Sequence, residues 1–351
     1  MKLFTLGPVA MYPETLKIAG QQLPYFRTSE FSKIMLENEQ RLKDLLHLTR
    51  GYIAMLTGSG TAAMEAVVAC CLGKENRVLI INGGSFGARF VQLCDCYHIP
   101  YDTLKVPFGT ALTQEQLNAI DGSQYDALLV NIHETSTGQL YSLSMLSNFV
   151  KKHGLYFIVD AISSFGADLY QMDDYGVDCT ILSSQKALAL SPGISMVAMQ
   201  ESFYKEMVEM RRPQNLYLNL REHVLNMERG QTPFTPHVGA LLELHDRLQQ
   251  IEQQGMEVMC ETSKQRAEYF RTEVKKLGIR IPDYPLSNAL TPILLQGNAE
   301  DVFHILKDKY DIIVTPSGGD LKDKLLRIGH LGNQSMEDYK ELLLRLKECV
   351  L

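Results

Sequence analysis

Two apolar runs near the middle of the chain end on side chains of opposite charge. The run "YFIVD" ends on Asp160, and the run "CTILSSQK" ends on Lys186. Because burial disfavours the charged form of a lysine, its pKa falls and its amine becomes free to bond a carbonyl carbon. A carboxylate at a buried strand end needs a cationic or hydrogen-bonded partner. The pair therefore indicates carbonyl chemistry on a lysine, unless Asp160 only caps the next turn and Lys186 lies on the surface.

The segment "TGSGTAAMEA" is a third candidate. Its residues Ser59, Gly60 and Thr61 open a predicted helix, where free N–H groups and the helix dipole favour a phosphate group. The segment has neither a G-K-[ST] ending nor a G-x-G-x-x-G pattern, so it is not a Walker loop or a dinucleotide fingerprint. The simpler alternative is a tight turn followed by a helix cap.

A phosphate site, an acid and an amine lysine are the three features that one cofactor, pyridoxal 5′-phosphate (PLP), requires. The lysine bonds the aldehyde carbon of the cofactor, and the acid keeps the pyridine nitrogen protonated so that the ring accepts electrons. In this interpretation Asp160 and Lys186 are partners of the same cofactor and not of each other.

The surrounding elements can place these residues together. From about residue 50 to 200, runs rich in Val, Ile and Leu alternate with helical patterns, which predicts an α/β fold with a mainly parallel sheet covered on both faces. Ligands of such sheets bind outside the carboxyl ends of the strands, where the three candidates lie. Strands are predicted at "YIAMLT", "RVLIIN", "ALLVNIH", "YFIVDA", "CTILSS" and "ISMVAMQ". A helical pattern at about 239–278 leads into a smaller α+β unit, with a boundary near residue 255.

Composition narrows the class of protein. The chain has 351 residues, 45% of them hydrophobic, and a formal charge of −7, which argues against nucleic acid as the main partner. It has no apolar run long enough to span a membrane, and its first residues make a poor signal peptide. The seven cysteines form no C-x-x-C pair, so we expect reduced thiols, no metal site and a cytoplasmic location.

Along nearly its whole length the sequence resembles the class V aminotransferases, which are PLP enzymes of fold type I. It is most similar to the branch of alanine–glyoxylate, serine–pyruvate and 2-aminoethylphosphonate–pyruvate aminotransferases. The resemblance implies a seven-stranded, mainly parallel sheet between helices, with an N-terminal arm at 1–15, a large PLP-binding domain at 16–255 and a small C-terminal α+β domain at 256–351. The motifs that carry it are "LGPVAMYPE", "FRTSEF", "GSGTAAMEA", "NGGSFGAR", "HETSTGQL", "VDAISSFGAD", "SSQKALALSPG", "GQTPFTP" and "LLRIGHLG".

The resemblance also implies roles for individual residues. Lys186 matches the lysine that bonds the cofactor and moves the proton, and Asp160 matches the partner of the pyridine nitrogen. Phe86 falls where the family stacks an aromatic residue on the cofactor ring, unless it is a core phenylalanine. Ser59, Gly60 and Thr61 match the phosphate loop, and Gln185, beside the lysine, matches a further phosphate contact. Thr135 matches a residue near the phenolic oxygen of the cofactor.

Two further sites involve a second subunit and the substrate. Thr232 and Thr235 match the segment that reaches the phosphate of the neighbouring subunit, which implies a homodimer with shared active sites. Arg327 matches the arginine that binds the substrate carboxylate, although from the residues alone it reads as a surface arginine on an edge strand. Arg27 is a candidate for a second anion contact or a structural ion pair.

The expected activity is a ping-pong transamination. An amino group moves from alanine, serine or 2-aminoethylphosphonate to pyruvate or glyoxylate. The family's alanine–glyoxylate members stack a tryptophan on the cofactor, whereas this chain has none, so the branch stays open. One alternative is a lyase such as a cysteine desulfurase, but "TPSGGDLKDK", where its cysteine loop would lie, has no cysteine. The other is a non-catalytic regulatory protein, although Lys186 is retained and a DNA-binding extension is absent.

Overall fold

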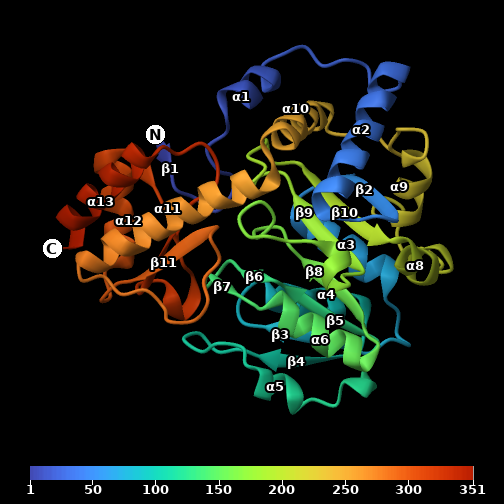
Figure 1. The fold of residues 1–351 in the computed structure, drawn as a ribbon, viewed down its shortest axis with the longest axis horizontal. Coiled ribbons are helices and arrows are strands. Elements are labelled where there is room, and N and C mark those ends of the chain that lie inside the picture. The colour runs from blue at the N-terminus through green and yellow to red at the C-terminus, as the bar shows by residue number, and fades with distance from the viewer. Residues whose placement is uncertain (351) are drawn as a thin grey trace.

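A seven-stranded sheet forms the centre of the protein. The computed structural model describes residues 1–350. All strands of this sheet run parallel except β10, which is antiparallel to both of its neighbours. The predicted α/β fold class is therefore confirmed (Figure 1). In spatial order the strands are β2 (Gly51–Thr57), β10 (Ile194–Gln200), β9 (Cys179–Ser183), β8 (Tyr156–Asp160), β5 (Ala127–Asn131), β3 (Val78–Asn82) and β4 (Tyr101–Lys105).

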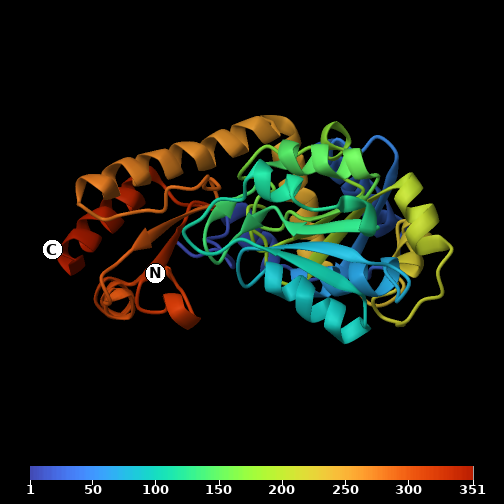
Figure 2. The same ribbon diagram turned by 90° about the horizontal axis from the view of Figure 1, so that it is seen from below.

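Alternate residues of each strand pack on opposite faces of this sheet. In β5, Leu128 and Val130 join one hydrophobic cluster, whereas Ala127 and Leu129 join the other. Figure 2 shows helices on both sides of the sheet. Helices α2 (Ser29–Leu46), α6 (Leu143–His153) and α10 (Val238–Gln254) contribute to the first cluster. Helices α3 (Gly60–Cys71), α4 (Gly87–Tyr97) and α9 (Leu220–Met227) contribute to the second.

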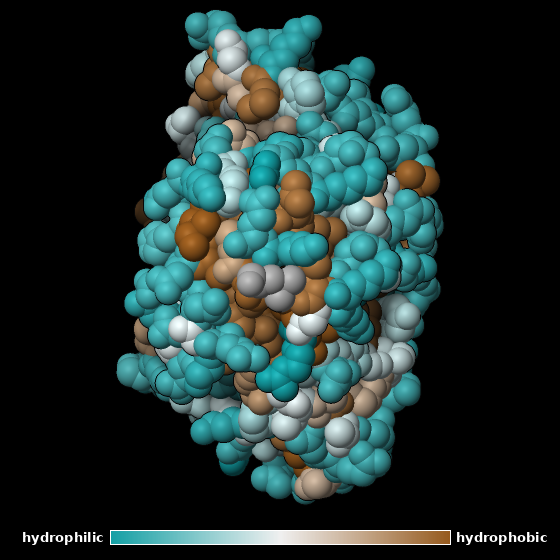
Figure 3. All heavy atoms as spheres, turned by 90° about the vertical axis from the view of Figure 1, so that its left-hand side faces the viewer, coloured by the Kyte–Doolittle hydropathy of each residue, from teal (hydrophilic) through white to brown (hydrophobic). Residues whose placement is uncertain are grey.

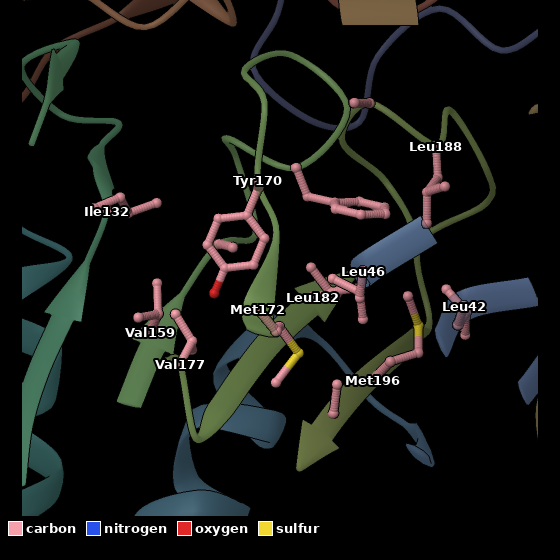
Figure 4. Packing of buried hydrophobic residues seen from close by; sticks show 14 of the residues in the cluster. Leu42, Leu46, Ile132, Val159, Tyr170, Met172, Val177, Leu182, Leu188 and Met196 are labelled. Atoms are coloured by element: carbon pink, nitrogen blue, oxygen red, sulfur yellow. The ribbon is translucent and has the colours of Figure 1, made fainter. Parts of the chain in front are cut away.

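The first cluster shows how closely a helix and the sheet pack. Leu42 and Leu46 of α2 lie with Leu182 of β9 and Met196 of β10, and all four side chains are buried (Figure 4). Burying a leucine of this kind contributes about 1.5–3 kcal/mol to folding. This packing therefore anchors the part of the sheet whose carboxyl end carries the candidate residues.

The C-terminal residues form a smaller lobe with its own core. Helix α11 (Met256–Lys276) follows α10 after a break at Gly255, so the helical pattern at 239–278 is two helices. A three-stranded antiparallel sheet packs against the lobe's helices, and Figure 3 shows this end of the molecule, where hydrophilic side chains surround a smaller hydrophobic area. The strands of this sheet are β11 (Leu290–Leu294), β14 (Leu325–Gly329) and β13 (Thr315–Pro316). The lobe also contains α12 (Ala299–Tyr310), β12 (Ile312–Ile313) and α13 (Met336–Val350).

The N-terminus packs on this smaller lobe. Strand β1 (Lys2–Leu3) pairs in parallel with β12, and Phe4 is fully buried beside Tyr339, with 5.0 Å between ring centroids. The chain then crosses to the large lobe, where α1 (Pro13–Ala19) lies against α10 (Figure 1). The remaining short elements are α5 (Gln114–Asn118), β6 (His133–Glu134), β7 (Gln139–Leu140), α7 (Met172–Tyr175) and α8 (Glu201–Tyr204).

Two features bear on the environment of the protein. None of the helices within residues 1–350 is both long and apolar enough to cross a membrane. All seven cysteines are free thiols; Cys96 is exposed and Cys349 is partly buried, whereas the other five are buried.

Candidate active site

Lys186 lies in the turn that follows β9. The turn is fixed by Ser184, whose N–H donates to the carbonyl of Ile194 and whose hydroxyl donates to the carbonyl of Ser191. The lysine side chain is only 9% exposed, and residues 1–350 provide no hydrogen-bond or ion-pair partner for its amine. Burial lowers the pKa of Lys186 to about 8, and the positive charge of Arg327 acts in the same direction, against the attraction of Asp160.

Asp160 ends the neighbouring parallel strand β8, so it reaches the same edge of the sheet. Its Oδ1 accepts a hydrogen bond from the N–H of Ile162 at 2.8 Å. Burial raises the pKa of the carboxyl group to about 7, despite this hydrogen bond and the nearby charge of Lys186. A buried acid with one oxygen free, close to a buried amine, has the character of a ligand site.

Helix α3 begins at the same edge. Its N-cap residue Ser59 makes no side-chain capping bond, so the first N–H groups of the helix keep their hydrogen-bonding capacity. A Cβ at Gly60 would lie 2.4 Å from Cδ1 of Ile162, two residues after Asp160, so a larger residue would have to displace the Ile162 side chain. The hydroxyl of Thr61 accepts a hydrogen bond from Arg89 at 2.9 Å, which adds a cation to a helix end that already attracts anions.

Glu134 is a site residue that we did not predict. Its carboxylate is fully buried and accepts hydrogen bonds from the backbone N–H of Phe86 at 3.3 Å and of Gly87 at 3.0 Å. It also accepts from the N–H of Ser136 at 3.1 Å. Glu134 thus joins the loop of Phe86 to the loop of Thr135. Its signal in the sequence was an acid directly after a buried strand, within the motif "HETSTG".

Three more predicted residues have the following contacts. Phe86 is partly buried at the start of α4, with the guanidinium of Arg89 5.8 Å from its ring centroid. The hydroxyl of Thr135 lies 2.7 Å from that of Ser163. The side-chain oxygen of Gln185 accepts a hydrogen bond from Ser183 at 2.5 Å.

Arg327 reaches this group from strand β14 of the smaller lobe. Its Nη1 donates to the carbonyl of Thr135 at 3.0 Å and its Nη2 to that of Pro316 at 2.6 Å, while its buried Nε has no partner among residues 1–350. Burial lowers the pKa of Arg327 to about 10, although the charge of Glu134 opposes this shift. The guanidinium lines a cavity of about 850 Å³ together with Ser85. A partly buried guanidinium without a paired carboxylate favours an anionic ligand.

The other three predicted residues form a separate group. Arg27 donates from Nη1 to the side chain of Gln231 at 3.1 Å and to the carbonyl of Thr232 at 3.0 Å. The hydroxyl of Thr232 donates to the carbonyl of Phe234, and Thr235 is exposed. Within one chain, none of the three forms a hydrogen bond with Lys186, Asp160 or Arg327.

The residues at the sheet edge fit PLP. A buried amine without a partner, a buried acid with one free oxygen and an uncapped helix start match the aldehyde, the ring nitrogen and the phosphate of that cofactor. The fold and this set of groups together define a PLP-dependent enzyme of fold type I.

Comparisons with known proteins give the family. Residues 20–322 match the model of the aminotransferase class-V family, and the chain belongs to that family. It is 30% identical, over 93% of its length and 86% of the relative, to the soluble hydrogenase small subunit of Synechococcus sp. (strain PCC 6716). It is also 30% identical, over 80% of its length and 74% of the relative, to the 2-aminoethylphosphonate–pyruvate transaminase of Pseudomonas aeruginosa.

Solved structures agree with this family. The crystal structure of alanine–glyoxylate aminotransferase from Nostoc sp. superimposes with a TM-score of 0.93 at 25% identity. The match covers 100% of this chain and 96% of that one. The protein is therefore a class V aminotransferase that depends on PLP.

Proposed function

We propose that this aminotransferase moves an amino group from a small donor, namely alanine, serine or 2-aminoethylphosphonate, to pyruvate or glyoxylate in two half-reactions. The observation that carries the proposal is the arrangement of Lys186, Asp160 and Arg327. Lys186 and Asp160 are buried and Arg327 is partly buried. The charges of Asp160 and Arg327 shift the pKa of the lysine amine in opposite directions, and none of the three residues is neutralised by an ion pair among residues 1–350. Groups of this kind are kept for a ligand that completes their interactions.

Lys186 has two roles in this proposal. It holds the cofactor covalently, and its amine takes the proton from the α-carbon of the donor and returns it on the cofactor side. A pKa of about 8 suits this role, because a base works best when its pKa lies near the working pH. The cofactor, when bound, supplies the electron sink that makes the α-proton acidic.

The other residues of the sheet edge orient the cofactor. The free oxygen of Asp160 would hold the proton of the pyridine nitrogen. The start of α3 at Ser59, Gly60 and Thr61, with Gln185, would bind the phosphate group. Phe86 would supply the stacking contact to the ring, and the hydroxyl of Thr135 would contact the phenolic oxygen.

Arg327 binds the carboxylate of the substrate. Its guanidinium keeps an unused Nε–H beside its two Nη groups, and a planar fork of this kind matches a carboxylate in a bidentate manner. Pyruvate, glyoxylate, alanine and serine all carry such a carboxylate. Phe86 stands where a tryptophan is expected in the alanine–glyoxylate members, so the stacking residue does not assign the donor.

We further propose a homodimer in which each subunit completes the site of its partner. Arg27 is hydrogen-bonded to the carbonyl of Thr232, so it would support the segment of Thr232 and Thr235 at the partner's phosphate site. Exposed apolar side chains flank this unit: Tyr25 is 68% exposed, and Leu216 is 75% exposed. Arg27 then has an interface role.

Covalent trapping tests the assignment of the lysine. The purified protein, loaded with PLP, is reduced with borohydride and digested, and the labelled peptide is identified by mass spectrometry. We expect the label on Lys186 and none in Lys186→Ala, while Lys205→Ala, which changes an exposed lysine, is labelled like the wild type. A label that persists elsewhere in Lys186→Ala at the wild-type level would overturn the assignment.

A further inference from the structure

Residues 4–10, which we call the N-terminal strap, cross from the smaller lobe to Lys186 and return. The smaller lobe holds both ends of the strap. The N–H of Phe4 donates to the carbonyl of Ile313, and the N–H of Gly329 donates to the carbonyl of Phe4, each at 2.8 Å. At the other end, the N–H of Asn333 donates to the carbonyl of Ala10 at 2.9 Å.

The middle of the strap touches the side chain of Lys186. A Cβ at Gly7 would lie 2.7 Å from Cδ and 3.1 Å from Cε of the lysine, and 3.0 Å from the backbone oxygen of Gln185. Distances this short mean that any side chain at position 7 would have to displace the lysine stem. Gly7 also has a φ of +131°, which residues with a Cβ rarely adopt. The backbone at Gly7 therefore packs directly on the lysine stem.

The same strap lies against the strand of Arg327. A Cβ at Gly329, two residues after Arg327 on β14, would lie 2.2 Å from the backbone oxygen of Thr5. Thr5 and Gly7 are themselves two residues apart. A short, closely packed path thus runs from the strand of Arg327 through the strap to the stem of Lys186, and this path does not pass through the large sheet.

We propose that Gly7 is a positioning residue for Lys186 and that the strap fixes the lysine amine relative to the guanidinium of Arg327. The proposal depends on the role of Lys186 proposed above. A lysine stem has many rotamers, and a backbone wall along the stem reduces the number that must be lost when the amine bonds a ligand. Holding the reacting group in place is worth large factors in rate and binding.

A cycle of variants tests whether Gly7 acts through the lysine. Equilibrium binding of PLP is measured by ultrafiltration for the wild type, Gly7→Ala, Lys186→Ala and the double variant. We expect Gly7→Ala to weaken binding by about tenfold or more in the wild-type background, because the methyl group displaces the stem. In the Lys186→Ala background, where there is no stem to displace, we expect no further loss. Equal weakening in both backgrounds would contradict the proposal.

Gly278→Ala is the matched control for backbone strain. Gly278 has a φ of +76° and no atom within 4 Å of a built Cβ, so its substitution strains the backbone without touching Lys186. We expect it to bind PLP like the wild type. If Gly7→Ala does not fold, Gly329→Ala, which displaces the strap at Thr5, takes its place in the cycle with the same two expected outcomes.

The test separates this proposal from the proposed function. If wild-type protein is labelled on Lys186 by PLP and borohydride but Gly7→Ala binds PLP with the wild-type affinity, the positioning role fails and the function stands. If the wild type is not labelled on Lys186, the proposed function fails first.

Discussion

The guanidinium of Arg327, from the smaller lobe, donates a 3.0 Å hydrogen bond to the backbone carbonyl of Thr135, from the large lobe. Thr135 follows Glu134, whose buried carboxylate also holds the backbone of Phe86 and Gly87. The arginine that we assign to the substrate carboxylate is therefore tied to the loops that we assign to the cofactor ring. The position of Arg327 therefore depends on contacts with both lobes, and the arginine lies where they meet.

Arg327→Lys is expected to weaken donor binding more than cofactor binding. A lysine cannot reproduce the two parallel hydrogen bonds of a guanidinium, and charged hydrogen bonds of this kind contribute about 1.5–3 kcal/mol. The concentration of alanine that gives half-maximal conversion of the cofactor should rise by about 10- to 100-fold. Arg280→Lys, at an exposed position of the same lobe, is the control. An unchanged alanine dependence would exclude Arg327 from the donor site.

The apoprotein should show a pH dependence of stability that comes from Asp160. Burial raises the pKa of this acid from 3.8 to about 7 in the folded state. Its contribution to stability is therefore complete below the ordinary pKa and is lost as the pH rises to about 7. The midpoint of thermal unfolding should fall less between pH 4 and 7 in Asp160→Asn than in the wild type. Parallel curves for the two proteins would contradict the raised pKa.

Glu134→Gln should loosen the loop that carries Phe86. The amide has only one acceptor oxygen, so at least one buried N–H group loses its partner, at a cost of about 1–3 kcal/mol. We expect a lower unfolding temperature and a weaker circular dichroism signal from bound PLP. Glu261→Gln, at an exposed position on α11, should change neither. A wild-type cofactor signal in Glu134→Gln would show that the carboxylate does not order the ring site.

Mixing two inactive variants tests the shared active sites. Thr235→Asp places a negative charge where we expect the partner's phosphate, and Lys186→Ala removes the reactive amine. A mixed dimer of the two has one site with an intact lysine from one subunit and an intact Thr235 from the other. Activity should therefore appear after subunit exchange. If tagged mixed dimers form but stay inactive, the sites are not shared in this manner.

The sequence predicted most of the sheet because its central strands are continuous apolar runs. The apolar pattern did not predict strand β4, because "YDTLK" is the outermost strand of the sheet and its residues are half-buried or exposed. The sequence placed a domain boundary near residue 255, but it did not show that the helical pattern at 239–278 is broken there by Gly255, with a φ of +91°. Edge position and backbone conformation are properties of the fold and not of local composition.

Only part of the candidate site could be predicted, because contacts between distant segments are also not visible in local composition. Residues that do chemistry, such as Lys186, were recognisable by type and spacing. Glu134 and Gly7 were not, because their importance comes from contacts with segments distant in the chain. From the residues alone Arg327 reads as a surface arginine, whereas the fold of the smaller lobe places it, partly buried, against Thr135.

The most direct test of the proposed function is a half-reaction screen. PLP-loaded protein is mixed separately with alanine, serine, aspartate and 2-aminoethylphosphonate, without any acceptor, and the cofactor absorbance is followed. We predict rapid loss of the lysine-bound cofactor band with at least one of alanine, serine and 2-aminoethylphosphonate, and its return when pyruvate or glyoxylate is added. Lys186→Ala should show neither change. A band that none of these three donors alters would contradict the proposed function.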